Sequence, residues 1–112
     1  MSKVFILQEV MRRDKVTGRT TPAHDFAPAA VYGEIVFVID AQSRPSIIGR
    51  TLANQLKDVL KDFTEGDYLL PVGDPSMILV AGAILGKMHK TFNVLQWERR
   101  QRAYIAMEIN NV

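Results

Sequence analysis

The most constraining feature of this sequence is a strand-turn-helix pattern that begins at Asp67. Residues 67–72 read Asp-Tyr-Leu-Leu-Pro-Val, a short apolar run that is typical of a buried strand. A Gly-Asp-Pro turn follows, and residues 77–85 are then apolar except for Gly82, which predicts a helix that is buried on most sides. A strand that leads directly into a buried helix belongs to a sheet covered by helices, so the pattern predicts an α/β fold.

The other apolar segments complete a single α/β domain over residues 1–112, a length that suits one hydrophobic core. The expected order is strand, long loop, strand, helix, strand, helix, strand, strand. This gives a five-stranded mixed sheet with two main helices and a C-terminal antiparallel hairpin, and right-handed crossovers make the second, third and fourth strands parallel. Strands are expected at 3–8, 34–40, 68–72, 92–97 and 103–109, and helices at 48–63 and 75–89.

The hairpin and the long loop carry more specific expectations. Residues 103–109 alternate between apolar and other side chains, which predicts one dry and one wet face. Residues 10–33 show no sustained period and contain two glycines and two prolines, so they predict a long loop or extended segment. A loop of this length in a compact domain is usually functional or mobile. The apolar residues of 26–32 predict that its second half packs against the domain as a helical turn.

The basic residues gather at two loops, although the formal net charge is only +2. The first loop has four basic residues against Asp14, and the second has three arginines against Glu98. Aromatic side chains among arginines are typical of surfaces that stack on nucleic-acid bases. The simpler interpretation is a solvated hairpin end whose charge protects the sheet edge. The predicted contacts for a partner or a nucleic acid are Arg12, Arg13, Arg19, Trp97, Arg99, Arg100, Arg102 and Tyr104.

A second candidate site lies where strands end. Loops between a strand and a helix N-terminus bind anionic ligands in α/β folds, which makes Gly73, Asp74 and Ser76 candidates. The simpler interpretation is that the Asp74 carboxylate caps the helix, with Pro75 at its first position. Asp40 is expected at the same edge of the sheet, where two carboxylates on neighbouring strands could hold Mg²⁺, or each could cap its own loop.

Gly82 and Gly86 lie one helical turn apart in the second helix. Each glycine in a helix interior costs about 1 kcal/mol relative to alanine, so a tight contact is expected to offset this cost. The spacing predicts close packing within the chain rather than a dimer seam, because the small-residue dimer motif belongs to membranes.

Several chemistries find no support in the sequence. The chain has no cysteine and two histidines, with no metal-ligand spacing and no nucleotide-binding or hydrolase motif. The adjacent His24 and Asp25 are interpreted as surface residues. We therefore expect no catalytic residue, metal or cofactor, and a protein that is more easily explained as a non-enzyme. The apolar run at 77–85 is about half of the ~20 residues that a membrane span needs, so no membrane association is expected.

Two strings resemble a family of small uncharacterised proteins of tailed bacteriophages. The first is the Asp-Tyr-Leu-Leu-Pro-Val-Gly-Asp-Pro segment at 67–75, and the second runs from Leu95 to Tyr104 with the spacing Leu-x-Trp-x-Arg-x-x-Arg-x-Tyr. The resemblance covers the C-terminal half of the chain better than the early loop. It implies a viral protein in the cytoplasm of the host bacterium, and it brings no enzyme motif.

We therefore expect a non-enzymatic phage accessory protein that binds a host or phage macromolecule in the infected cell. A protein partner is favoured over a nucleic acid, and a homodimer is expected if one face of the sheet lacks a cover. One alternative is binding or turnover of a small nucleotide-like ligand at the strand ends around Gly73 and Asp74. Another is a structural or assembly component of the virion.

Overall fold

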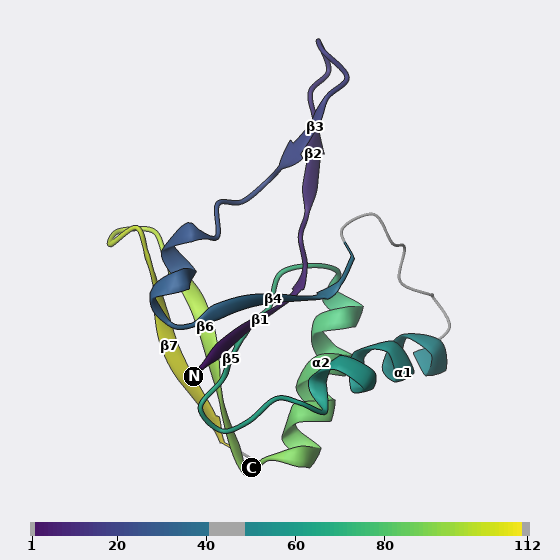
Figure 1. Cartoon of the computed structure of the whole chain (residues 1–112), viewed down its shortest axis with the longest axis vertical. Helices are drawn as coiled ribbons and strands as arrows, with labels where there is room; N and C mark the ends of the chain where they lie inside the picture. The colour runs from purple at the N-terminus through teal and green to yellow at the C-terminus, as the bar shows by residue number, and fades with distance from the viewer. Residues whose placement is uncertain (1, 41–48, 111–112) are drawn as a thin grey trace.

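The structure is a computed structural model that describes residues 2–40 and 49–110 (Figure 1). The second predicted helix and the C-terminal hairpin are present with nearly the expected bounds, while the start of the first predicted helix, at residue 48, lies outside the described residues. In chain order the elements are β1 (Lys3–Gln8), β2 (Met11–Arg13), β3 (Thr20–Pro22), the 3-10 helix η1 (Ala27–Val31), β4 (Glu34–Ile39), α1 (Gly49–Leu60), β5 (Tyr68–Leu70), α2 (Pro75–Met88), β6 (Thr91–Glu98) and β7 (Ala103–Asn110).

Five strands form one mixed sheet in the order β4-β1-β5-β6-β7, which confirms the predicted fold class. Neighbouring strands are parallel except β6 and β7, which pair antiparallel from Thr91–Asn110 to Glu98–Ala103. From β1 the chain moves to β4, the neighbour on one side of β1. It then returns to β5, on the other side of β1, and continues outward to β6. Right-handed crossovers then place η1 on one face of the sheet and the two α-helices on the opposite face.

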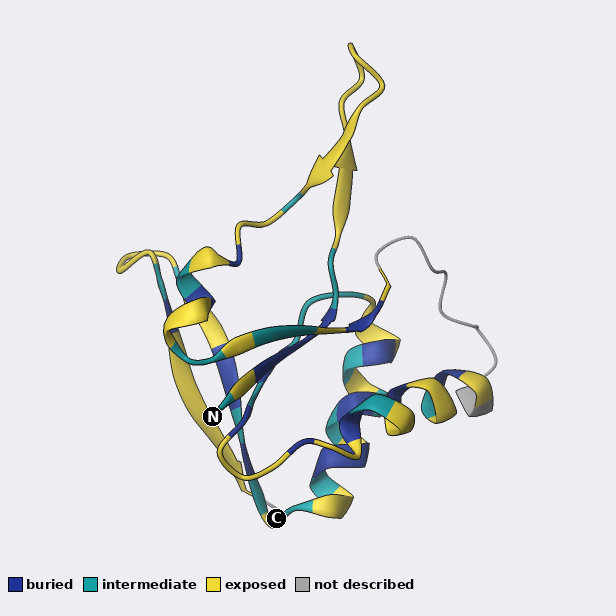
Figure 2. Cartoon of the chain, in the orientation of Figure 1, coloured by how far each residue is buried: buried dark blue, intermediate teal, exposed yellow. Residues whose placement is uncertain are grey.

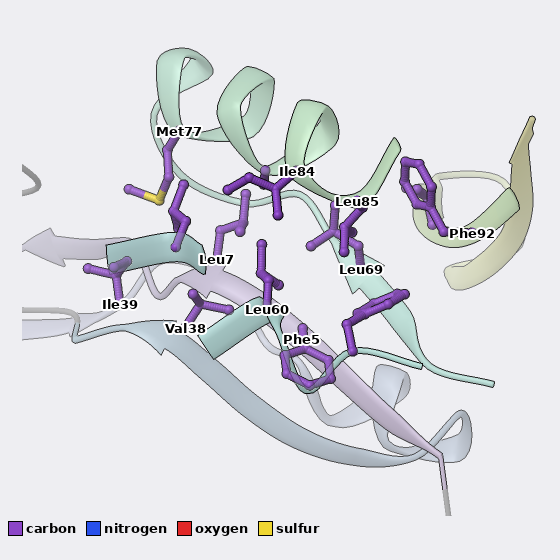
Figure 3. Close-up of a cluster of buried hydrophobic side chains, with 14 of the residues drawn as sticks. Phe5, Leu7, Val38, Ile39, Leu60, Leu69, Met77, Ile84, Leu85 and Phe92 are labelled. Carbon is purple, nitrogen blue, oxygen red and sulfur yellow. The ribbon is translucent and has the colours of Figure 1, made fainter. Parts of the chain in front are cut away.

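The helical face of the sheet holds the larger part of the core. The apolar stripe of α1, including Leu56 and Leu60, and the buried side of α2, including Met77 and Leu85, form one buried cluster with Phe5 of β1, which Figure 3 shows in part. All five side chains are at most 2% exposed. Fully burying one such side chain stabilises the fold by about 1.5–3 kcal/mol, so this cluster fixes both helices on the sheet.

The other face is covered by η1 and the residues beside it. Phe26 and Ala29 pack against Ile6 and Leu95 of the sheet. The hydroxyl of Tyr32 donates a hydrogen bond of 2.6 Å to the carbonyl oxygen of Tyr104. The predicted helical turn in residues 26–32 is therefore confirmed, and it gives this face of the sheet a cover from within the chain.

Residues 10–33, predicted as a loop or extended segment, contain regular structure in their first half that the sequence did not predict. Strands β2 and β3 pair antiparallel from Met11–Pro22 to Arg13–Thr20 and form a hairpin that projects from the body (Figure 1). The intervening turn is closed by the Asp14 carboxylate, which accepts the N–H of Val16 at 2.8 Å. This hydrogen bond and one from the N–H of Thr17 hold the pKa of Asp14 below its usual value.

The physical reason for the missed hairpin is its exposure. Every residue from Met11 to Pro22 is exposed (Figure 2). A strand with neither face buried needs no alternation of apolar and polar side chains, so its sequence carries no period to detect.

Two expectations on the α2 side are also corrected. On β7 the predicted dry face is not covered, since Ile105, Met107 and Ile109 are 36–42% exposed. Added Cβ atoms at Gly82 and Gly86 would meet nothing within 4 Å, so the tight intramolecular contact expected there is absent from the described residues. Both corrections have one cause: α2 packs against α1 and the inner strands, and it leaves β7, at the edge of the sheet, uncovered.

Candidate functional site

A cavity of about 750 Å³ opens at the carboxyl end of the parallel strands, beside η1. The β5–β6 ladder ends at the pair Leu69–Val94, whereas β6 continues to Glu98, so the two strands separate beyond that pair. We call this cavity the aromatic pocket. It is lined by Ala23, His24, Asp25, Pro28, Leu70, Pro71, Val72, Val94, Leu95, Gln96, Trp97, Tyr104 and Met107.

Two aromatic side chains form one wall of the aromatic pocket. Trp97 and Tyr104 are paired across the β6–β7 ladder, and their rings meet edge to face with centroids 4.9 Å apart. Tyr104 is 8% exposed, while Trp97 is 43% exposed. The structure thus joins two residues that the sequence predicted as partner contacts, with Tyr104 supporting the open indole of Trp97.

Two polar side chains form the opposite wall. The Asp25 carboxylate accepts the N–H of Ala27 at 3.0 Å, which fixes its position at the start of η1. Burial raises the pKa of Tyr104, and the negative charge of Asp25 raises it further. His24 and Asp25 are exposed, as predicted, but their role in lining a pocket was not predicted. No local motif marks them, because they lie far from Trp97 along the chain.

The basic residues at the two loops do not form a single patch. Figure 1 shows the β2–β3 hairpin and the β6–β7 turn projecting at separate corners of the molecule. Each nevertheless begins beside the aromatic pocket, because Ala23 directly follows β3 and Trp97 lies two residues before the turn. Among the described residues, the arginines at these two places (Arg12, Arg13, Arg19, Arg99, Arg100 and Arg102) are exposed and take part in no ion pair within the chain.

Arg102 has an unusual backbone. It adopts φ +49°, the left-handed region, and its N–H donates to the carbonyl of Arg99 at 3.4 Å. A residue with a side chain costs about 1–2 kcal/mol in this conformation, where glycine fits without strain. The turn therefore holds an arginine at a position where glycine would make it more stable.

None of the four residues predicted at the strand ends lines the aromatic pocket. The premise that Asp40 and Asp74 follow neighbouring strands is wrong, because β1 lies between β4 and β5. Two strand spacings separate those strands by about 10 Å. Gln8 occupies the space between them: its side-chain amide donates to the Asp40 carbonyl at 2.7 Å, and its N–H donates to the Val72 carbonyl at 3.1 Å. Gly73 adopts φ +139° in the turn that follows.

Asp74 occupies the N-cap position of α2, but its side chain makes no capping hydrogen bond. Its backbone carbonyl accepts the N–H of Ile78 at 3.0 Å, the first bond of the helix. Asp74 and Ser76 are both exposed, and Pro75 offers no N–H. The predicted side-chain cap is therefore wrong, because the carboxylate stays in solvent, while the proposed ligand-binding role of Gly73, Asp74 and Ser76 stays a prediction.

Among the described residues, no group of three or more His, Cys, Asp or Glu side chains is close enough to hold a metal ion. No helix in residues 2–40 and 49–110 has the length and apolar character that crossing a membrane requires.

Comparison with known proteins gives one match. The family model described as phage Pam3 gp32-like protein matches residues 2–111. No curated protein and no solved structure matches the chain. The match agrees with the resemblance to phage proteins drawn from the two sequence strings, and it extends over the early loop that those strings did not cover.

Proposed function

The chain belongs to the phage Pam3 gp32-like protein family, and we propose that it is a phage accessory protein that binds single-stranded nucleic acid in the infected cell. On this proposal the protein acts by binding and not by catalysis. The observation that carries the proposal is the half-exposed Trp97 in a pocket whose lining residues Ala23 and Trp97 lie at the bases of the two arginine-bearing hairpins.

Each part of this arrangement matches one part of a nucleic-acid strand. A base stacked on an aromatic side chain contributes about 1–3 kcal/mol, with little dependence on sequence. The indole of Trp97 offers such a surface, and the aromatic pocket has room for a base. Arginines with no ion pair in the chain are available for phosphates on either side.

The polar wall of the aromatic pocket fits the same ligand. The carboxylate of Asp25 accepts hydrogen bonds, and the amino and imino groups of nucleobases donate them. Asp25 would repel a purely anionic ligand. A nucleobase in the pocket avoids this repulsion, because its phosphates stay outside the pocket, where they can pair with the arginines. The proposal therefore favours a strand over free phosphate, and a nucleic acid over the protein partner that the sequence favoured.

Binding of a labelled single-stranded oligonucleotide of about 20 nucleotides, measured by fluorescence anisotropy at several salt concentrations, tests the proposal. At about 3.4 Å per nucleotide this strand is longer than the 47 Å extent of the molecule. We expect affinity to fall steeply with salt. In the triple variant Arg99→Gln, Arg100→Gln, Arg102→Gln, the slope of log K against log salt should decrease by about 2, since each phosphate contact contributes about 0.7.

The matched control removes the same charge from the helical side of the molecule, with Lys57→Gln, Lys87→Gln and Lys90→Gln, all exposed. We expect this variant to keep most of the wild-type affinity. Equal losses in the two variants would mean that only net charge matters. An absence of binding at about 50 mM salt would overturn the proposal and return the protein partner to first place.

A further inference from the structure

The exposed side of α2 is unusual for a surface helix. From Pro75 to Met88 its only polar side chains are Ser76 and Lys87. Leu79 nevertheless is 75% exposed, and Ala83 one turn later is also exposed. A helix that is apolar all round is normally buried on all sides, so this side of α2 lacks a cover in the single chain.

A groove runs beside the exposed side of α2. It has a volume of about 350 Å³ and is lined by Ile78, Gly82 and Gly86 of the helix and by Phe92 and Ile109 of the hairpin. The two glycines create the space, since a Cβ atom at either would meet nothing within 4 Å. Their cost of about 1 kcal/mol each is not offset by any packing within the described chain.

Strand β7 continues this apolar surface to the edge of the sheet. Ile105, Met107 and Ile109 face the helical side and are 36–42% exposed. Edge strands are usually protected by lysine, proline or inward charge. β7 contains neither lysine nor proline, and its one charged residue, Glu108, points to the opposite face.

We propose that a second copy of the chain covers this surface, which we call the α2–β7 surface and define by Ile78, Leu79, Gly82, Ala83, Gly86, Ile105, Met107 and Ile109. The two copies are related by a two-fold axis near Gly82, and Leu79 of each copy lies in the groove of the other. This inference does not rest on the proposed nucleic-acid binding, since Met107 is the one residue of the surface that also lines the aromatic pocket, and the central residues Leu79, Gly82 and Gly86 do not.

Self-complementarity argues for a second copy over another partner. An isologous interface needs the projecting side chain and its recess on the same patch. Leu79 lies three to seven residues from Gly82 and Gly86, about 5–10 Å along the helix, so both features are present. The α2–β7 surface itself carries no charge, and Lys87 lies at its margin. It therefore offers nothing to an anionic strand and no like-charge repulsion at the centre of a dimer.

The size of the surface is sufficient for a modest dimer. It extends along about 20 Å of α2 and across about 20 Å, the combined width of one helix and two strands. The flat footprint is therefore about 400 Å² per copy, without the extra area that projecting side chains add. Weaker specific interfaces bury up to about 600 Å² per partner, so this footprint lies within their range. We therefore expect association at micromolar concentrations rather than an obligate dimer.

Sedimentation equilibrium of the full chain without nucleic acid, from about 5 to 200 μM, tests the proposal. We expect the mean mass to rise from 12.6 kDa toward twice that value. Leu79→Lys should keep the mass of one chain throughout, and so should Gly86→Leu, which fills the groove. Val31→Lys is the matched control, because Val31 is 83% exposed on η1, and it should associate like the wild type.

Circular dichroism at each concentration shows whether the variants are folded. We expect them to fold, because Leu79 is exposed and an added side chain at Gly86 meets open space. A wild-type mass of 12.6 kDa up to about 200 μM would overturn the proposal. Association of a folded Leu79→Lys variant as strong as that of the wild type would also overturn it, since the copies would then meet through another surface.

Discussion

The buried carboxylate of Asp67 gives the most quantitative prediction. Asp67 is 3% exposed and accepts three hydrogen bonds. One carboxylate oxygen accepts the N–H of Lys3 at 2.8 Å, and the other accepts the N–H and the hydroxyl of Thr64 at 2.8 and 3.0 Å. A single side chain thus joins the start of β1 to the segment that leads into β5, two strands of the sheet centre.

Replacing Asp67 by alanine leaves the N–H groups of Lys3 and Thr64 without acceptors. An unsatisfied buried donor costs about 1–3 kcal/mol, while the Thr64 hydroxyl can turn to solvent, so we expect a loss of about 3 kcal/mol. For a domain of this size that loss lowers the melting temperature by roughly 10–20 °C. Asp67→Asn should cost less, because the amide keeps one acceptor oxygen.

Urea denaturation followed by circular dichroism measures these losses, with Asp62→Ala as the control. Asp62 is exposed five residues earlier, and its replacement should change the free energy of unfolding by no more than about 0.5 kcal/mol. A loss below about 1 kcal/mol for Asp67→Ala would refute the reasoning, because it would mean that water replaces the carboxylate at no cost.

Three further predictions concern other parts of the molecule. The double variant Gly82→Ala, Gly86→Ala should raise the free energy of unfolding by up to about 1 kcal/mol per site, since the added methyl groups meet open space. A free energy of unfolding below that of the wild type, measured by urea denaturation, would instead reveal a hidden contact at these glycines. Arg102→Gly should relieve its left-handed backbone and raise stability by about 1 kcal/mol while weakening oligonucleotide binding, two effects that denaturation and anisotropy separate. The pKa of Tyr104 is raised in the folded state, so the neutral phenol contributes stability that is complete below about pH 10 and is lost as pH rises through the folded pKa. Denaturation between pH 9 and 11 should show this loss in the wild type and not in Tyr104→Phe.

Much of the fold was predictable because burial leaves periods in a sequence. The central strands read as continuous apolar runs, since helices or η1 cover both of their faces. The hairpin at 11–22 left no such trace, because neither of its faces is buried. The strand order was also not predictable from handedness alone, and this is why Asp40 and Asp74 were wrongly placed on neighbouring strands.

The candidate site was predictable in part for the same reason. Trp97 and Tyr104 belong to one hairpin, so local spacing brought them together. His24 and Asp25 reach the aromatic pocket only because η1 packs on the sheet and Tyr32 bonds to Tyr104, contacts between segments far apart in the chain. Asp67 shows the same limit, since its partner Lys3 lies 64 residues earlier in the chain.

The most direct test of the proposed function uses the emission of Trp97, which is the only tryptophan of the chain. Titration with a single-stranded oligonucleotide should quench this emission at the same concentrations at which anisotropy reports binding, because a base stacks on the indole. Saturable binding with unchanged Trp97 emission, or no binding at low salt, would contradict the account.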